Sequence, residues 1–249
     1  MVRFVMGKGQ EIQAVLRAVI ELPEEWHAAG TFHRKGLEKL VEHAGRLDIQ
    51  YSVETGTGKT TLLFSHLSGH HTVFAKDDSD DGDSLQVVRE CPILQREKVE
   101  FVVGPTQRTL PNYEFKNKLQ LVLIDGPHAY PFVELEYYYL YPQVCAGGLL
   151  VLDDIHIPTI FNMFRFLRED RMFELVEVVK TTAFFKRTSE HPLDPFGDGW
   201  WLQEYNKRRF PIHDGVMGYS MYDRMKYRVP QPVRTFVKKA LGIAGDPKK

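Results

Sequence analysis

Short apolar runs alternate with helix-length segments through the middle of this 249-residue chain. Five of these runs are rich in β-branched and other apolar residues, and they lie at 49–54, 71–75, 99–103, 119–125 and 148–154. Near-continuous apolar strands separated by helices are typical of a parallel sheet that is covered on both faces. The pattern therefore predicts an α/β fold with a doubly wound, mostly parallel sheet.

Two further apolar runs follow these strands with almost no gap between them. They are FELVEVVK (173–180) and TAFFKR (182–187). A parallel crossover needs about a dozen residues or more, so a connection this short predicts an antiparallel hairpin at the edge of the sheet. Together the seven runs predict a seven-stranded sheet.

The segments on either side of this core follow other patterns. Apolar residues recur at helical spacing in 9–22 and in 34–47. After Arg187 the chain is rich in Pro, Gly and aromatic residues, and 233–245 has the pattern of a basic amphipathic helix. We therefore expect an N-terminal helical segment packed on the core, a core domain and a C-terminal extension, at 1–47, 48–190 and 191–249.

Composition places the chain among soluble globular proteins, with 43% hydrophobic and 26% charged residues. Only two cysteines, Cys91 and Cys145, argue against a disulfide framework and for a reducing compartment. The first residues carry Lys8 and Glu11 and lack the apolar core of a signal peptide. No uncharged apolar run approaches the ~20 residues that span a bilayer. We expect a cytoplasmic protein without a transmembrane segment.

Charge is unevenly distributed along the chain. Residues 207–249 hold eleven Lys/Arg and three Asp/Glu, a net charge of +8. The preceding 206 residues hold 21 basic and 30 acidic residues, a net charge of −9. A basic tail on an acidic body suits contact with an anionic partner or docking on its own domain. The acidic core argues against a stable nucleic-acid partner.

The stretch VETGTGKTT (53–61) lies where the first predicted strand turns into a helix. A Walker loop needs Gly, four residues and then Gly-Lys-Ser/Thr. Counting back from the Gly58-Lys59 pair places Val53, which is inside the strand, where the first glycine should be. The dinucleotide pattern Gly-x-Gly-x-x-Gly fails as well, because its last position is Thr61. The sequence therefore predicts neither a nucleoside triphosphate site nor a dinucleotide site at this loop.

The loop instead offers an acid and two spaced glycines, Glu54-x-Gly56-x-Gly58. Glycines allow close approach to a ligand, and the helix that follows points free N–H groups at a negative group. The acid suits a cationic ligand group. Asp77, beside Asp78, lies 21 residues beyond Gly56, where this topology places a carboxylate for ribose hydroxyls. An amine, a carboxylate and a ribose together describe S-adenosylmethionine; a purely structural turn is the alternative.

The chain resembles the class I S-adenosylmethionine-dependent methyltransferases from about Leu37 to Arg187. VETGTGKTT is similar to their first motif, VVGPT (102–106) to the adenine-side turn, and 121–154 to the fourth strand, its helix, the Gly-Gly turn and the fifth strand. The resemblance implies their Rossmann-like fold and S-adenosylmethionine as cofactor. The cofactor-binding residues that it implies are Glu54, Thr55, Gly56, Thr57, Gly58, Thr60, Thr61, Asp77, Asp78, Gly104, Pro105, Thr106, Asp125 and Gly126.

One position departs from the commonest form of the first motif. Thr60 stands where many members of the family have a third glycine. The O-methyltransferases that methylate sugars and macrolides often have Ser or Thr at this position. The departure therefore favours a resemblance to the enzymes that act on small molecules.

Three carboxylates follow the fourth and fifth predicted strands. Asp125 opens the segment DGPH, and Asp153-Asp154 closes the fifth strand. Ligands of open α/β sheets bind over the carboxyl ends of the strands, so we expect all three acids to face the crevice of the glycine loop. Crowded carboxylates repel unless they are protonated or bind a cation, and hard oxygen ligands suit Mg²⁺. Alternatively, Asp153-Asp154 caps the next helix.

The same residues resemble the metal site of catechol-type and macrolide-sugar O-methyltransferases. This resemblance implies Asp125, Asp153 and Asp154 as Mg²⁺ ligands. In the sugar-modifying relatives a His three positions after the first Asp can act as base, which implies His128 as the catalytic base, with Asp125 as the other proton acceptor. His156 is a second candidate base.

The predicted activity is methyl transfer to an oxygen of a small hydroxylated acceptor, such as a sugar, a phenol or a natural product. Trp200 and Trp201 in the C-terminal extension either cover the acceptor or pack structurally. Two alternatives stay open: a metal-independent methyltransferase that uses His128 alone, and a non-catalytic binding module on the same fold. A homo-oligomer is compatible with the sequence.

Overall fold

The computed structural model describes residues 8–23, 26, 32–76, 84–194 and 197–209, and positions 230, 232–233, 236 and 240. The chain divides into two compact units, Met1–Asp198 and Gly199–Lys249. The first unit holds the sheet and the cavity described below. The second unit contains the short helices η4 (Trp200–Leu202) and α8 (Glu204–Arg209).

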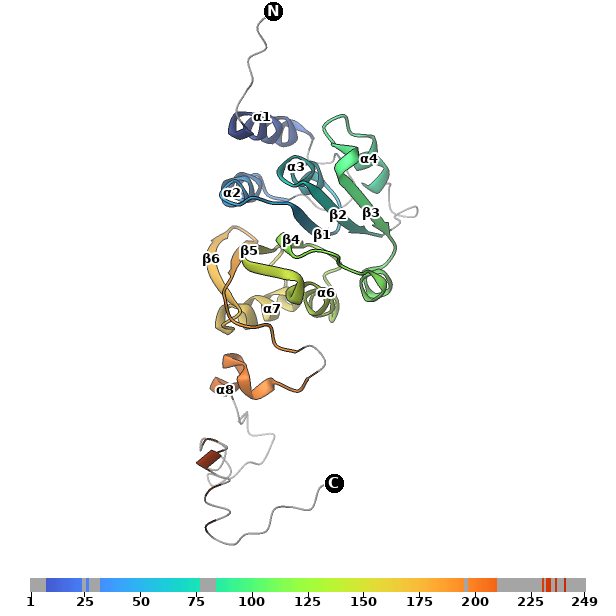
Figure 1. The fold of residues 1–249 in the computed structure, drawn as a ribbon. Helices are drawn as coiled ribbons and strands as arrows, with labels where there is room; N and C mark the ends of the chain where they lie inside the picture. Colours follow the sequence, from blue (N-terminus) through green and yellow to red (C-terminus); the bar gives the residue numbers. More distant parts are fainter. Residues whose placement is uncertain are drawn as a thin grey trace, which may run out of the picture. The chain divides into compact units, whose positions relative to one another are not determined.

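The first unit is built on one seven-stranded sheet (Figure 1). Its strand order is β3-β2-β1-β4-β5-β7-β6. The strands β1 to β5 are parallel, and β7 and β6 run antiparallel at one edge. The strand bounds are β1 Tyr51–Thr55, β2 His70–Ala75, β3 Val99–Val103, β4 Leu119–Ile124, β5 Val144–Leu152, β6 Phe173–Val179 and β7 Thr182–Arg187.

Helices cover both faces of the sheet, with α1 to α4 on one face and α6 and α7 on the other (Figure 1). Their bounds are α1 Lys8–Glu21, α2 Arg34–Ala44, α3 Lys59–Leu67, α4 Ser84–Glu90, α5 Thr106–Thr109, α6 Phe132–Leu140 and α7 Pro158–Glu169. Short 3₁₀ helices lie at η1 Arg96–Lys98, η2 Leu110–Asn112 and η3 Tyr141–Gln143. None of the helices among the described residues is long and apolar enough to cross a membrane.

Alternate residues of the central strands enter two separate cores. On β4, Val122 and Ile124 pack in the cluster that contains α6 and α7, while Leu121 and Leu123 pack in the cluster that contains α1, α2 and α3. All four side chains are buried. A strand that is buried on both faces needs apolar residues at every position, which explains the unbroken apolar runs in the sequence.

The predicted fold class is confirmed, including the antiparallel edge hairpin. Lys180 and Thr181 form the two-residue turn between β6 and β7, and Lys180 has a positive φ of 58°, as tight hairpin turns require. The two predicted N-terminal helices correspond to α1 and α2. The helix expected at 233–245 falls almost entirely outside the described residues, and the boundaries at 47/48 and 190/191 stay predictions.

The register of the strands brings the loops that carry the predicted site residues to one edge of the sheet. Thr55 at the end of β1 lies beside Ile124 at the end of β4, and Ile124 lies beside Leu152 at the end of β5. The three strands therefore end level with one another. Whatever follows each of them, namely the glycine loop, the segment DGPH and the acid pair, starts from the same edge of the sheet.

Candidate active site

A cavity of about 560 Å³ lies over these strand ends. It draws its walls from the glycine loop, the end of β2, the turn after β3 and the loops after β4 and β5. The predicted site residues that line it are Gly56, Thr57, Gly58, Thr60, Pro105, Thr106, Asp125, Gly126, His128, Asp153 and Asp154. The other lining residues are Phe32, Lys59, Phe74, Ala75, Lys76, Gln107, Pro127 and Phe132.

Several predicted cofactor residues do not line this cavity. Glu54, Thr55 and Thr61 are buried under the glycine loop, and Gly104 lies at the foot of the turn after β3. Asp77 and Asp78 lie outside the described residues. The structure thus gathers most of the predicted set in one cavity and places three of its members beneath the loop.

The glycine loop and the loop after β4 touch at Gly56. Gly56 has a φ of 90°, and a Cβ added to it would overlap the carbonyl oxygen of Asp125. Both the backbone conformation and the close approach therefore require glycine. The contact holds the cofactor-side loop directly against the loop that carries Asp125, Gly126 and His128.

Lys59 is the first residue of α3 and is tied to the N-terminal segment. Its Nζ donates a hydrogen bond of 2.8 Å to the carbonyl oxygen of Leu22, just beyond the end of α1. The side chain is 5% exposed. This contact gives the ammonium group a structural partner, in line with the failed Walker pattern.

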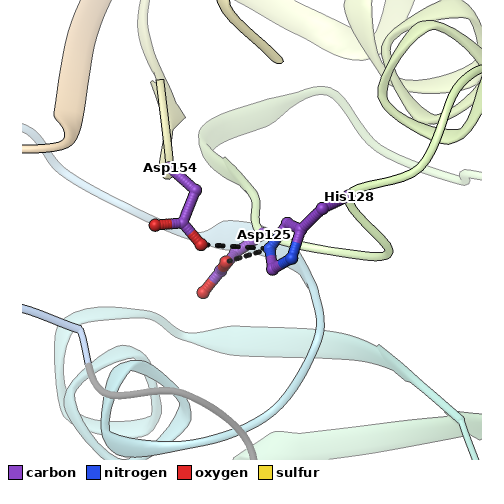
Figure 2. Close-up of side chains that lie close together, drawn as sticks. All are labelled: Asp125, His128 and Asp154. Atoms are coloured by element: carbon purple, nitrogen blue, oxygen red, sulfur yellow. Dashed lines mark ion pairs between the residues drawn. The ribbon is translucent and has the colours of Figure 1, made fainter. Parts of the chain in front are cut away.

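Asp125, His128 and Asp154 converge on one point from two loops (Figure 2). His128 Nε2 lies 3.0 Å from Asp154 Oδ2 and 4.0 Å from Asp125 Oδ1. One ligand atom from each residue lies within 4.8 Å of the other two. His156 Nδ1 lies 3.5 Å from Asp154 Oδ1, on the outer side of the cluster.

The three groups perturb one another's protonation. Burial raises the pKa of Asp125 to about 8, and the neighbouring Asp153 and Asp154 add to the rise, while His128 opposes it. The neighbouring carboxylates of Asp125 and Asp154 raise the pKa of His128 to about 10. The pKa of Asp154 is lowered, chiefly by His128. In this arrangement His128 is a cation at neutral pH, Asp125 largely keeps its proton, and the charge of His128 balances the ionised Asp154.

The two acids after β5, Asp153 and Asp154, make different contacts. Asp153 is 5% exposed, and its Oδ1 accepts a hydrogen bond of 2.5 Å from Thr182 Oγ1 on β7. Asp154 has a positive φ of 53°, a conformation that Asp tolerates better than most residues. Its carboxylate belongs to the three-residue cluster, and the Asp153 carboxylate is anchored to the edge hairpin.

Sequence reasoning missed Glu136, a fully buried acid on α6. Its Oε2 accepts a hydrogen bond of 2.8 Å from Thr55 Oγ1, and that hydroxyl oxygen accepts one of 3.0 Å from the backbone N–H of Asp125. A Cβ on Gly126 would overlap the Glu136 carboxylate. The helical period was the available signal, because position 136 shares a face with the buried Val133 and Leu140.

A Gly56→Ala variant is expected to lose more stability than Gly147→Ala. Both positions have a positive φ, which costs a side chain about 1–2 kcal/mol, but nothing lies within 4 Å of a Cβ at Gly147. The methyl group of Gly56→Ala would also collide with the Asp125 carbonyl, and this clash adds to the cost. Urea denaturation measures both variants, and equal losses would show that the contact carries no constraint.

A Glu136→Gln variant is expected to change how stability depends on pH. Burial raises the pKa of Glu136 from its ordinary 4.5 to about 7, so between these values the folded protein holds a proton that the unfolded chain releases. Stability of the wild type therefore falls as pH rises from 4.5 to 7. The Gln variant avoids this loss, which amounts to about 3 kcal/mol above pH 7.

The measurement is chemical denaturation of both proteins at a series of pH values between 4 and 8. Glu97→Gln, at an exposed position of η1, is the matched control and is expected to follow the wild type throughout. A constant difference between Glu136→Gln and wild type would contradict the pKa of Glu136.

The sequence was compared with family models and with curated proteins. The family model described as "Methyltransferase domain" matches residues 53–155, the span from the glycine loop to just beyond the acid pair. No curated protein shows a significant sequence match to the chain.

Several solved structures share the fold. An O-methyltransferase candidate from Klebsiella pneumoniae has a TM-score of 0.52 and 15% identity, covering 75% of this chain and 93% of its own. Cofactor-bound Rv0187 from MTB has a TM-score of 0.52 and 19% identity, covering 76% and 94%. The O-methyltransferase TomG from Streptomyces achromogenes, involved in tomaymycin synthesis and solved with S-adenosylmethionine, has a TM-score of 0.51 and 13% identity, covering 74% and 91%. The chain therefore has the Rossmann-like methyltransferase fold, and its residues 53–155 match the model of a methyltransferase domain.

Proposed function

We propose that the protein transfers a methyl group from S-adenosylmethionine to a hydroxyl oxygen of a small acceptor, assisted by Mg²⁺. The observation that carries the proposal is the shared cavity: the glycine loop and the cluster of Asp125, His128 and Asp154 line the same hollow. A donor held by the loop and a proton acceptor at the cluster are thereby brought together.

The cavity fits the cofactor in size and chemistry. Its volume of about 560 Å³ lies in the range of small-molecule sites. The start of α3 offers N–H groups to a carboxylate. TomG, which shares the fold, was solved with S-adenosylmethionine. Ribose contacts from Asp77 and Asp78 are part of the proposal.

The carboxylates fit a divalent cation. Mg²⁺ is held in most proteins by one or two carboxylates and keeps several waters. Asp125 and Asp154, whose oxygens converge beside His128, are the proposed ligands. Asp153, the third ligand that the sequence predicts, lines the same cavity and would ligate only after exchanging its hydrogen bond from Thr182.

S-adenosylmethionine supplies the electrophilic methyl group, and bound Mg²⁺ supplies a charge that lowers the pKa of an acceptor hydroxyl. His128 takes the hydroxyl proton. The two carboxylates that raise the pKa of His128 are the ones proposed to hold the cation. A cation held by these carboxylates would remove the cause of the raised pKa, and His128 would then be a neutral base.

The surrounding side chains align the reactants and exclude water. Phe32, Phe74 and Phe132 form apolar parts of the cavity wall. In-line transfer requires the acceptor oxygen ~3–3.5 Å from the methyl carbon, a geometry that a preformed cavity provides at low entropic cost.

A metal-independent enzyme is the second candidate. The direct 3.0 Å contact between His128 and Asp154 favours it, because the carboxylate orients the imidazole without a cation. In such an enzyme His128 would act as the base after losing the proton that it holds at neutral pH. Chelation separates the two candidates.

Calorimetry with S-adenosylmethionine, with and without EDTA, is the first test. We expect binding in both conditions and methyl transfer to a hydroxylated acceptor only without EDTA. A screen of sugars, phenols and glycosides supplies the acceptor. Absence of cofactor binding would remove the proposal, and transfer that ignores the chelator would select the metal-independent enzyme.

Asp154→Asn is expected to lower methyl transfer by about 100-fold or more. Cofactor affinity should stay within about threefold, because Asp154 is proposed to hold the metal ion beside the acceptor and not to contact the cofactor. Asp48→Asn, at an exposed position before β1, is the control and should retain full activity. Normal turnover of Asp154→Asn would rule out the cluster as the catalytic centre. The readout is transfer of a labelled methyl group.

A further inference from the structure

A chain of buried polar side chains runs beneath the glycine loop. Ser68 Oγ lies 2.5 Å from Ser52 Oγ, which lies 2.8 Å from His71 Nδ1. His71 Nε2 lies 3.3 Å from Glu54 Oε1, and the same carboxylate oxygen accepts a short hydrogen bond from Thr61 Oγ1. All five residues are at most 3% exposed. None of them lines the cavity, so they act on it only through the loop.

The direction of the hydrogen bonds at the loop depends on Glu54. A hydroxyl has one proton, and Thr61 donates it to Glu54. Thr61 Oγ1 is then an acceptor for every other neighbour, and it accepts a hydrogen bond of 3.0 Å from the backbone N–H of Gly58. The Gly58 turn, which lines the cavity, is therefore held by the carboxylate through one intervening hydroxyl.

His71 fixes the carboxylate from the opposite side. Its ring is fully buried, held at Nδ1 by Ser52 and packed edge-on against Phe64 with ring centroids 4.9 Å apart. A buried carboxylate without sufficient partners is costly, and among the described residues neither Glu54 Oε2 nor His71 Nε2 has a hydrogen-bond partner. The 3.3 Å approach of His71 Nε2 to Glu54 Oε1 is an ion-pair contact without hydrogen-bond geometry. Glu54 Oε1 thus depends on His71 and Thr61 for its place.

We infer that His71 is a positioning residue for cofactor binding: through Glu54 and Thr61 it holds the Gly58 turn in the shape that receives S-adenosylmethionine. This inference rests on the proposed function. It assigns to a buried histidine on β2, remote from the ligand, control over cofactor affinity and not over the methyl-transfer step.

Two substitutions of His71 distinguish the contact made by Nδ1 from the contact made by Nε2. In His71→Gln the side-chain amide reaches the place of Nε2 and can donate to Glu54, whereas in His71→Asn it reaches only the place of Nδ1 and serves Ser52. Both replace the ring by an amide. We expect His71→Asn to weaken binding of S-adenosylhomocysteine by about tenfold, the loss typical of one polar contact to a buried charged group, and His71→Gln to stay within about threefold.

Two further readouts exclude a merely structural role. At saturating cofactor, kcat should equal that of the wild type in both variants, so that the change is confined to KM for the cofactor. In the ligand-free protein, hydrogen exchange of the Gly58 amide should accelerate about tenfold in His71→Asn and stay unchanged in His71→Gln. Equal effects of the two variants, in either binding or exchange, would overturn the inference.

Thr61 provides a second pair if His71→Asn fails to fold. Thr61→Val keeps the side-chain shape without the hydroxyl and should reproduce the tenfold loss and the faster Gly58 exchange, and Thr61→Ser should restore both. A Thr61→Val protein that binds like the wild type would overturn the inference. A wild-type protein that binds no cofactor overturns the proposed function and the affinity claim, and the exchange contrast then decides whether His71 holds the loop.

Discussion

The contact between the ends of β1 and β4 is the constraint on which the site depends. Gly56 lies against the Asp125 carbonyl, and the Thr55 hydroxyl joins the Asp125 N–H to the buried Glu136. Two loops that are distant in the sequence are thereby held at one spacing. This spacing would set the distance between the proposed methyl donor at the first loop and the proposed acceptor beside the second.

Charge balance at the cavity mouth follows from the same arrangement. Asp125 and Asp154 come from neighbouring strands that end level, so their carboxylates meet and need a counter-charge. His128 supplies it in this structure, at 3.0 Å from Asp154. A proton on the imidazole and the proposed divalent cation would thus be alternative ways to balance the charge of these carboxylates.

The sequence predicted the elements better than the partners. Apolar periodicity located all seven strands, and the short gap at Lys180 located the hairpin, because both signals are local. The role of Glu54 in cofactor binding stays a prediction, and the contacts of its Oε1 with Thr61 and His71 could not be read from the sequence. The different surroundings of Asp153 and Asp154 were equally hidden, since they arise from a backbone turn at Asp154 and a hydroxyl on β7.

The bond from Lys59 to Leu22 changes what counts as the working unit of this protein. The family match begins at residue 53, but the hollow over the strands includes Phe32, and the loop that shapes it is clamped to the end of α1. Phe32, just before α2, is consequently part of the cavity wall. A fragment that starts at residue 53 would retain the sheet and lack this part of the wall.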